Sequence, residues 1–596
     1  MNKKRIIHTF LQKLSKYHLN LSFYLLIVSV LYLNFYLFFN AVDRPLSLDY
    51  LPAVYFNAST AFLLALMYLL RKKNKNFVVF LLFSIALYLL SNVLYFRTYY
   101  SILPIDSIKM ASNLMGLKDS ITSSFRPTDL FFILPTLLLS LFYCFFFKTR
   151  LQLESKRYRI TLLVIVLVFV SSVIGKEFYV NRNNPYGLFT DENDFRYDVI
   201  EGTSSYGFLC CWAWQMNEFF AANLEITPKE TAKIEQWFSN HKHEHHIIAE
   251  NKGRNVILLI VESFESFPIE KKLEGREITP CVNKILREEA CLYANHVVPQ
   301  VKGGRSSDAQ LMINSGLLPM HSGAACFRKP QNSYKTLAKA LKEKKYNSYT
   351  LLGGNASFWN QGVFNKLMGY DLLIAIDQFR DDESFEFGLT DSTFLSQAAD
   401  KICHLQQPYL VQLITLSSHA PFELLDNRVY FQTPLDCPKE LAQYLNAIHY
   451  VDQCIGKFIA DLKKTGQYEK ATLIITGDHD AFNHKPHLSN KYGKKLLEER
   501  SYDPFIVLNA GISKRHTTVL GQIDLYPTLL DVLGLNHYEW RGLGNSILQP
   551  NPPQFAINAQ LNFVSNVQKT ANFPIKLSTE AWAISDLIIS KDYFGK

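Results

Sequence analysis

Long apolar runs in the first 176 residues constrain this chain more than any other feature of its sequence. A helix needs roughly 17–25 residues to cross a bilayer. Five runs reach that length, at residues 20–41, 51–70, 77–96, 128–147 and 160–176. If all five were buried in a soluble protein, the core would have to be implausibly large. The sequence therefore predicts a polytopic membrane domain of five transmembrane helices over residues 1–176.

The basic residues between these runs predict their orientation. They cluster before the first run, between the second and third, and between the fourth and fifth: Lys3, Lys4, Arg5, Lys13, Lys16, Arg71, Lys72, Lys73, Lys75, Lys148, Arg150, Lys156, Arg157 and Arg159. Cytoplasmic loops carry such an excess of lysine and arginine. We therefore expect a cytoplasmic N-terminus and an extracytoplasmic location for everything after the fifth run. The net charge of +9 arises largely from this pattern, and no basic stripe interleaved with aromatic residues indicates a nucleic-acid partner.

The remaining chain divides into a linker, residues 177–250, and a soluble domain, residues 251–596. The linker contains "HKHEHH" from His241 to His246, which is either a metal-binding group or a solvated segment. We favour the solvated segment because the histidines lie in a polar stretch before the domain begins. The nine cysteines are odd in number and form no CxxC pair, so we expect neither a disulfide framework nor a zinc ribbon.

Apolar segments that end in polar residues recur through the soluble domain. They are "NVILLIVESF", "SYTLLGGNASFW", "YLVQLITLSSH" and "ATLIITGDHD". Helical patterns alternate with them at residues 333–344, 392–404, 439–464 and 524–534. This alternation predicts an α/β domain with a mainly parallel sheet that helices cover on both faces. Ligands in such sheets bind beyond the carboxyl ends of the strands, where the polar residues of several strands meet.

Three of these polar residues form a candidate metal site. Glu262 ends one strand, and Asp478 and His479 end another. Two carboxylates and an imidazole suit Mn, with Zn or Mg as alternatives, and three protein ligands leave a position open for a reaction. In the alternative reading, Asp478 caps a helix and His479 packs in the core. The agreement of two strand ends favours one divalent metal ion.

The segment "VKGGRSSDAQLMINSG" supplies a candidate nucleophile. Two glycines form a turn, and Arg305, Ser306, Ser307 and Asp308 then open a helix. Backbone amides at a helix N-terminus favour phosphate, and a serine beside a divalent cation could attack phosphorus. Serine is also a common N-cap residue. One serine could cap the helix while the other reacts.

The order of these motifs carries a resemblance to a known family. Membrane spans are followed by "VESFESF", "GGRSSDA", "GGNASFWN", "LITLSSHAPF", "TGDHD" and "GQIDLYPTLLDVLG". This arrangement closely resembles the lipoteichoic acid synthase family of phosphoglycerol transferases, within the alkaline phosphatase and sulfatase superfamily. The resemblance covers nearly the whole chain. It implies a bacterial cytoplasmic-membrane enzyme with a sulfatase-like catalytic domain in the periplasm or at the cell surface.

The resemblance also implies roles for individual residues. The family's metal-binding positions fall on Glu262, Asp478 and His479, and its nucleophilic threonine falls on Ser306, which would also be a metal ligand. The family's substrate contacts fall on His419 and Trp359. To these we add Arg305, the basic neighbour of Ser306.

The chain departs from the family beside Trp359. The family often places an arginine after "FWN" to hold the phosphate of the headgroup, and this chain has Gln361. An aspartate earlier in that segment is replaced by Gly354. Glutamine cannot imitate the bidentate phosphate contact of arginine, so the headgroup is open. His484 and His487 could supply the contact, bind a second metal or have neither role.

The sequence thus predicts a transferase that moves a phosphoglycerol-type headgroup from a membrane phospholipid to a glycan, lipid or polymer acceptor. A phospho-Ser306 intermediate would carry the group. Phosphoethanolamine transfer on the same scaffold is the main alternative. A sulfatase is less favoured because "SSDAQ" lacks the proline and arginine of the sulfatase motif. A non-catalytic membrane sensor would keep the fold but need none of the metal and nucleophile positions.

Overall fold

The structure is a computed structural model of residues 1–596. The structure describes these residues: 25–42, 51–69, 75–99, 102–103, 125–146, isolated positions between 164 and 175, 199–221, 225–241, and 254–595 except 322, 330, 357, 386, 483–489, 498–499 and 568–574. Two compact units emerge, one containing residues 1–107 and 120–221 and the other containing residues 108–119 and 222–596. Each is described by itself.

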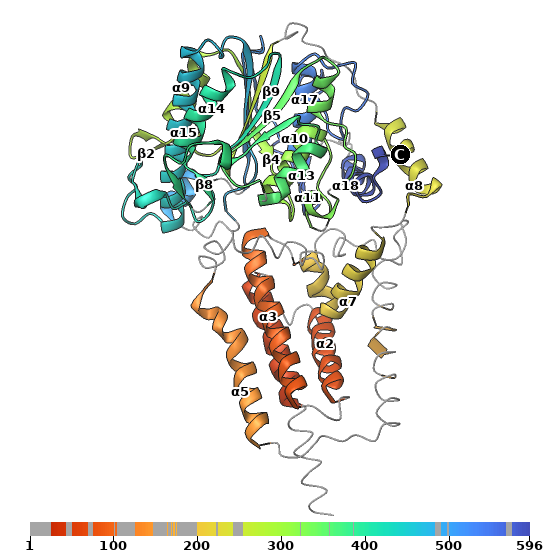
Figure 1. The fold of residues 1–596 in the computed structure, drawn as a ribbon. Coiled ribbons are helices and arrows are strands. Elements are labelled where there is room, and N and C mark those ends of the chain that lie inside the picture. Colours follow the sequence, from red (N-terminus) through yellow and green to blue (C-terminus); the bar gives the residue numbers. More distant parts are fainter. Residues whose placement is uncertain are drawn as a thin grey trace, which may run out of the picture. The chain divides into compact units, whose positions relative to one another are not determined.

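The first unit is helical (Figure 1). Its helices are 25–41, α2 (Leu51–Leu69), α3 (Lys75–Tyr99), α5 (Leu130–Phe146, preceded by the 3-10 turn Pro127–Asp129) and α7 (Val199–Ala221). Aromatic side chains join α7 to the first helix, since the rings of Phe35 and Phe208 stack 5.0 Å apart. Residues 199–221, which the sequence analysis placed in the linker, thus pack within the helical unit.

Four of the five expected spans fall wholly or partly on these helices, and the fifth, 160–176, lies largely outside the described residues. Phe80–Arg97 is the stretch, among the residues described, that is long and apolar enough to cross a membrane. Shorter apolar helices lie at Leu25–Ala41, Val54–Ala65 and Pro127–Leu141. Buried charge is paired here, because Arg97 holds the carboxylate of Asp129 through two hydrogen bonds of 2.7 and 2.8 Å.

The second unit is built on a nine-stranded sheet with the order β12-β4-β11-β10-β1-β9-β5-β6, and β13 also pairs with β4. The strands are β1 (Asn255–Val261), β4 (Cys291–Val298), β5 (Asn347–Leu352), β6 (Leu372–Ile374), β9 (Tyr409–Ile414), β10 (Ala471–Gly477), β11 (Asp503–Leu508), β12 (Lys514–His516) and β13 (Leu520–Gly521). Strand β11 runs antiparallel to both of its neighbours, and the other pairs are parallel. The sheet is therefore mainly parallel, as predicted.

Helices cover both faces of this sheet (Figure 1). One face carries α9 (Pro280–Glu288), α14 (Asp391–Ile402) and α15 (Lys439–Lys464), whose apolar side chains share a core cluster with β1, β9 and β10. The other helices of this unit are α8 (Pro228–Asn240), α10 (Arg305–Ser315), α11 (Ala325–Arg328), α12 (Leu337–Lys342), α13 (Gln361–Leu367), α16 (Lys491–Leu496), α17 (Leu525–Val532) and α18 (Ile575–Ser590). Strands β1 and β10 are buried along their whole length. That burial explains why they read as unbroken apolar runs.

Three two-stranded ribbons complete the unit. They are β2 (Lys272–Leu273) with β3 (Arg276–Glu277), β7 (Ser384–Phe385) with β8 (Gly388–Leu389), and β14 (Ala556–Ile557) with β15 (Phe563–Val564). The eight cysteines whose state the structure describes are free thiols. His241, from the histidine-rich linker segment, stacks on the ring of Trp237 at 4.5 Å.

Candidate active site

The register of two parallel strands brings two acidic residues together. Val261 at the end of β1 pairs with Gly477 at the end of β10, so Glu262 and Asp478 follow side by side. Ser263 then turns the chain sharply with a φ of 51°, and its backbone N–H donates to Asp478 Oδ1 at 2.7 Å. Positive φ at a non-glycine residue is a strained conformation that often marks a functional site.

His479 and Ser306 complete a compact cluster with these carboxylates. His479 Nε2 lies 3.3 Å from Glu262 Oε1 and 3.5 Å from Asp478 Oδ2. The hydroxyl of Ser306 lies 3.2 Å from Glu262 Oε2 and 3.3 Å from His479 Nε2. Four side chains from three separate segments therefore converge on one point, and all four are buried.

The first turn of α10 selects which serine faces this point. Asp308 Oδ2 accepts hydrogen bonds of 2.9 Å from the backbone N–H groups of Lys302 and Gly304, which closes the loop onto the helix. A Cβ at Gly304 would overlap the Asp308 carboxylate, so glycine is required there. Ser307 donates to the carbonyl of Gly304 at 2.7 Å. The structure thus turns Ser307 into the loop and Ser306 toward the carboxylates.

Burial and mutual charge set the protonation of the cluster. Burial raises the pKa of Asp478 to about 7, and the negative charge of Glu262 adds to that shift. Burial alone would also raise the pKa of Glu262, but the adjacent imidazole of His479 holds it well below its usual range. Burial and Arg305 oppose protonation of His479, yet the two carboxylates prevail and raise its pKa. The protonation of all three groups therefore depends on the positive charge that lies between the two carboxylates.

These residues fit a divalent cation. One donor atom from each of Glu262, Asp478 and His479 lies within 4.8 Å of the others. Asp478 Oδ2 is buried, and no donor among the described residues hydrogen bonds to it. An unsatisfied carboxylate oxygen inside a protein is costly. A mixed oxygen and nitrogen donor set is one that Mn or Zn accepts.

Arg305, expected to contact substrate, is engaged within the site itself. Its Nη1 donates to Asp480 Oδ1 at 2.9 Å, and its Nη2 donates to the carbonyl of Asp480 at 2.9 Å and lies 3.0 Å from His479 Nδ1. Arg305 also adopts a positive φ of 40°. The guanidinium therefore holds the Nδ1 side of the His479 imidazole, while its Nε2 side faces Ser306.

His419 lies at the edge of the cluster, on the loop after β9. It is half-buried, its Nδ1 lies 2.7 Å from the carbonyl of Ala420, and its ring lies 4.2 Å from that of Phe387. Burial lowers its pKa, although the charge of Glu262 opposes that shift. His419 is therefore a neutral imidazole beside the cluster at neutral pH.

Two other residues at the family's substrate-binding positions, Trp359 and Gln361, are buried. The ring of Trp359 lies 5.9 Å from that of Phe327 in α11. The Gln361 side chain is 2% exposed and accepts a hydrogen bond of 2.5 Å from Asn365 Nδ2. Its carboxamide thus takes part in the packing of α13. His484 and His487 lie outside the described residues.

Sequence reasoning missed the residues that hold Glu262 in place. Thr415 Oγ1 accepts from the backbone N–H of Glu262 at 3.1 Å, and Ser418 Oγ donates to its carbonyl. Both hydroxyls follow β9 in the segment "TLSSH". Hydroxyl side chains directly after a buried strand were the available signal, and parallel pairing with β1 is what gives them their role.

Residues 254–535 match the sulfatase family, and residues 2–201 match the lipoteichoic acid synthase N-terminal domain. Together these two matches make the chain similar to the lipoteichoic acid synthase family over most of its length. This lipoteichoic acid synthase-like chain is 27% identical over 507 residues to lipoteichoic acid synthase 2 of Bacillus subtilis, covering 82% of the chain and 77% of that protein. It is 23% identical over 505 residues to lipoteichoic acid synthase of Staphylococcus aureus, with 82% and 77% covered.

The fold is also similar to that of a solved family member. The crystal structure of the lipoteichoic acid synthase LtaP from Listeria monocytogenes superposes with a TM-score of 0.51 at 22% identity. The superposition covers 61% of this lipoteichoic acid synthase-like chain and 98% of LtaP. The second unit therefore has the alkaline phosphatase and sulfatase fold that the motif order implied.

Proposed function

We propose that this chain is a metal-dependent phosphoglycerol transferase that takes its headgroup from a membrane phospholipid. Relatives named lipoteichoic acid synthase cover most of the chain and support the reaction class. One observation carries the proposal. The hydroxyl of Ser306 lies 3.2 Å from Glu262 and 3.3 Å from His479 Nε2, at the N-terminus of a helix.

The residues of the site divide the chemistry between them. Ser306 Oγ attacks the phosphorus of the lipid phosphodiester, the bond to the diacylglycerol oxygen breaks, and diacylglycerol leaves as an alcohol. The headgroup stays on Ser306 as a phosphodiester. An acceptor hydroxyl then attacks the same phosphorus and releases the serine. We assign the proton exchange with the leaving or attacking oxygen to His419, a neutral imidazole near enough to Glu262 for their charges to interact.

Glu262, Asp478, His479 and Ser306 are the proposed metal ligands, and Mn is the proposed ion, with Zn or Mg as alternatives. A divalent cation there supplies positive charge that eases deprotonation of the serine and offsets charge developing on phosphorus. Arg305 and Asp480 hold the ring of His479 in the orientation that directs Nε2 inward. The metal ligands are thereby supported from behind, as in other metal sites.

The membrane anchor supports a lipid substrate. We propose that five spans lie within residues 1–176, that residues 177–250 connect them to the catalytic domain, and that residues 251–596 form that domain outside the cytoplasmic membrane. The N-terminal family match and the apolar helices of the first unit support this arrangement. An enzyme for a soluble substrate would gain little from such an anchor.

The proposal is tested with the full chain in detergent and Mn²⁺, using fluorescent phosphatidylglycerol and, separately, phosphatidylethanolamine. We expect diacylglycerol release from phosphatidylglycerol and none from the Ser306→Ala variant. Ser307→Ala is the matched control, because Ser307 faces the loop, and it should retain activity. Release from phosphatidylethanolamine alone would identify the alternative headgroup. Release from neither lipid, with Mn²⁺ bound, would contradict both donors.

A further inference from the structure

Two buried glutamines connect the segment that leads to Ser306 with the strand end that carries Asp478. Gln300 lies between β4 and Ser306, and Gln522 follows β13 directly. Strands β4 and β13 are parallel neighbours, so the residues that follow them lie side by side. Both glutamine side chains are buried. A buried carboxamide needs hydrogen-bond partners, and these two find theirs at the active site.

The carboxamide of Gln522 joins three separate segments. Its Oε1 accepts a hydrogen bond of 2.8 Å from the backbone N–H of Gln300. Its Nε2 donates to the carbonyl oxygen of Asp478 at 2.5 Å and to Asp503 Oδ2, at the start of β11, at 3.1 Å. One planar amide thus employs its oxygen and its nitrogen together. It holds the segment of Ser306 against the peptide group that links Asp478 to the next residue.

Gln300 returns this contact with its own side chain. Its Oε1 accepts from the backbone N–H of Ile523 at 3.0 Å, and its Nε2 donates to the carbonyl of Ile557 at 2.7 Å. Glycine at position 521 permits the approach, because a Cβ there would overlap Gln300 Oε1. Each side chain therefore holds the other's segment. We call Gln300 and Gln522 the glutamine bridge.

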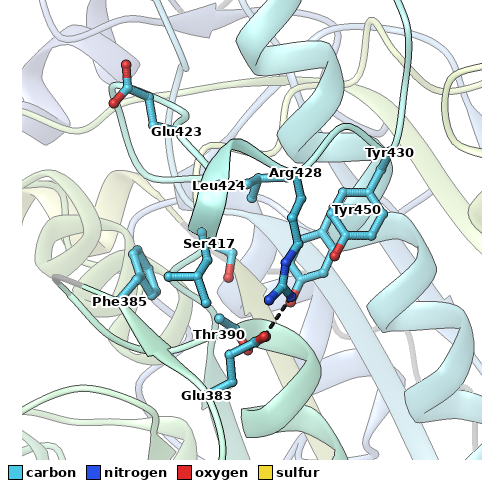
Figure 2. A pocket seen from close by; sticks show the side chains of 10 residues that line it. Glu383, Phe385, Thr390, Ser417, Glu423, Leu424, Arg428, Tyr430 and Tyr450 are labelled. Carbon is cyan, nitrogen blue, oxygen red and sulfur yellow. Dashed lines mark hydrogen bonds and ion pairs between the residues drawn. The ribbon is translucent and has the colours of Figure 1, made fainter.

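The Glu262 side of the site has a support of its own, on the loop after β9. Asp391 of α14 accepts hydrogen bonds of 2.9 and 3.1 Å from two consecutive backbone N–H groups of this loop, and its own N–H donates to Ser417 Oγ at 2.9 Å. Ser417 and the 2.6 Å ion pair of Arg428 and Glu383 line one pocket (Figure 2). These contacts are separate from the glutamine bridge, so Glu262 should keep its position when the bridge is broken.

We propose that Gln522 is a positioning residue for phosphoryl transfer. This inference rests on the proposed transferase function. The peptide group that Gln522 holds joins Asp478 to His479, and the Nε2 atom of His479 lies 3.3 Å from the hydroxyl of Ser306. Gln522 acts through the backbone of these segments and keeps Ser306 at that distance from the metal ligands.

Mn²⁺ binding tests this role without turnover. The full chain in detergent is titrated with Mn²⁺, and the free ion is measured by electron paramagnetic resonance. Binding that remains in Asp478→Asn is subtracted as background. Gln522→Met has a side chain of similar length but no N–H group or oxygen. We expect it to bind Mn²⁺ about ten-fold more weakly, as is typical when an outer partner of a metal site is lost.

Gln397 of α14 supplies the matched control. Its buried carboxamide accepts from the N–H of Arg380 at 2.9 Å, and it donates to the carbonyl of Arg380 at 2.8 Å and to Asp382 Oδ2 at 3.2 Å. Gln397→Met therefore loses the same kinds of hydrogen bond on a helix rather than at the strand ends. It should bind Mn²⁺ like the unaltered chain. Equal weakening in both methionine variants, or full Mn²⁺ affinity in Gln522→Met, would overturn the proposal.

Thermal scans in EDTA show whether each variant folds. If Gln522→Met does not fold, Gln522→Glu takes its place, because it keeps the oxygen that faces Gln300 and turns an acceptor toward Asp478 and Asp503. The same weakening of Mn²⁺ binding is expected, and full affinity in Gln522→Glu would likewise overturn the proposal.

Diacylglycerol release from phosphatidylglycerol is measured in the same samples at saturating Mn²⁺. Gln522→Met should release it about ten-fold more slowly or less, because Ser306 is no longer held against the ligands. Gln397→Met should release it like the unaltered chain. Weakened Mn²⁺ binding in Gln522→Met without release from the unaltered chain would overturn the transferase function alone. Normal release by Gln522→Met would overturn the positioning role alone.

Discussion

Two buried aspartates in the second unit differ in the hydrogen bonds that their carboxylate oxygens accept. Asp452 of α15 accepts hydrogen bonds of 2.8 Å on each oxygen, from the backbone N–H groups of Cys281 and Val282 at the start of α9. Asp478 at the end of β10 accepts two backbone hydrogen bonds on Oδ1, from Ser263 and His479, while Oδ2 lacks a donor among the described residues. Burial is common to both, and completed hydrogen bonding belongs to Asp452 alone.

The pKa values of Asp452 and Asp478 do not distinguish the two residues. Burial raises the pKa of Asp478 to about 7 and that of Asp452 to about 6. Asp452 nonetheless completes a helix N-terminus, where backbone amides and the helix dipole satisfy a carboxylate. Asp478 shares its surroundings with a second carboxylate, Glu262, and therefore needs a cation. The neighbouring carboxylate and imidazole, rather than burial, separate Asp478 from Asp452 here.

The largest expected difference between the two aspartates is in activity. Asp478→Asn should reduce diacylglycerol release from phosphatidylglycerol by about 10³-fold or more, because it removes a charged ligand from the site of phosphoryl transfer. Asp452→Asn should retain release within about two-fold once folded protein is compared, because its partners lie at α9. The measurement is the initial rate with saturating Mn²⁺. Equal losses in both variants would remove the distinction.

Metal binding should separate the same pair by stability. Mn²⁺ at 100 times its dissociation constant stabilises a protein that binds it only when folded by about 2.7 kcal/mol. We expect a corresponding rise in thermal midpoint for the unaltered chain and for Asp452→Asn, and little or none for Asp478→Asn. Scans with Mn²⁺ and with EDTA check this. A full Mn²⁺ shift in Asp478→Asn would place the ion elsewhere.

Without metal, Asp452→Asn should be the less stable of the two variants. Asp452→Asn leaves one backbone N–H of α9 facing an amide group and should cost about 1–3 kcal/mol. Asp478→Asn removes repulsion between two buried acids and should leave the metal-free midpoint unchanged or higher. Thermal scans in EDTA compare the two variants. Asp400→Asn on exposed α14 surface is the control and should change the midpoint little.

The sequence predicted the centre of the site well because strand ends are locally encoded. Unbroken apolar runs identified β1 and β10, and parallel pairing is enough to bring Glu262 and Asp478 together. The two glycines before Arg305 predicted a turn followed by a helix. The hydrogen bond that Asp308 accepts from the Gly304 N–H closes that turn. The strand ends alone thus predicted that Glu262 and Asp478 lie together, whereas the choice of Ser306 over Ser307 came from the family resemblance.

The roles of Arg305 and Gln361 could not be read in the same way. Arg305 was expected at the substrate, and its partner Asp480 lies 175 residues away in sequence. Gln361 stands where the family often has an arginine, and its carboxamide accepts from Asn365 one helical turn later. Both outcomes depend on side-chain direction, which composition and periodicity do not specify.

Two buried imidazoles extend the comparison to histidine and give the smallest expected effect. The carboxylates beside His479 raise its pKa, whereas burial, with Lys514 nearby, lowers the pKa of His516 to about 4. His516 is 4% exposed and lies 3.0 Å from the hydroxyl of Thr518. Since its folded pKa lies below the unfolded value near 6.5, stability from the neutral ring is present above that value and is lost as pH falls toward the folded pKa.

Between pH 7.5 and pH 5.5 this linkage amounts to about 1 kcal/mol, because the unfolded chain binds a proton that the folded chain does not. His516→Gln keeps a polar side chain of similar reach and removes the titration. The variant should therefore lose less stability than the unaltered chain over that interval, measured by thermal midpoints in EDTA. His404→Gln, at an exposed position on the same unit, controls for the substitution itself. If His516→Gln and the unaltered chain lost the same amount of stability over that interval, burial would not be what holds this imidazole neutral.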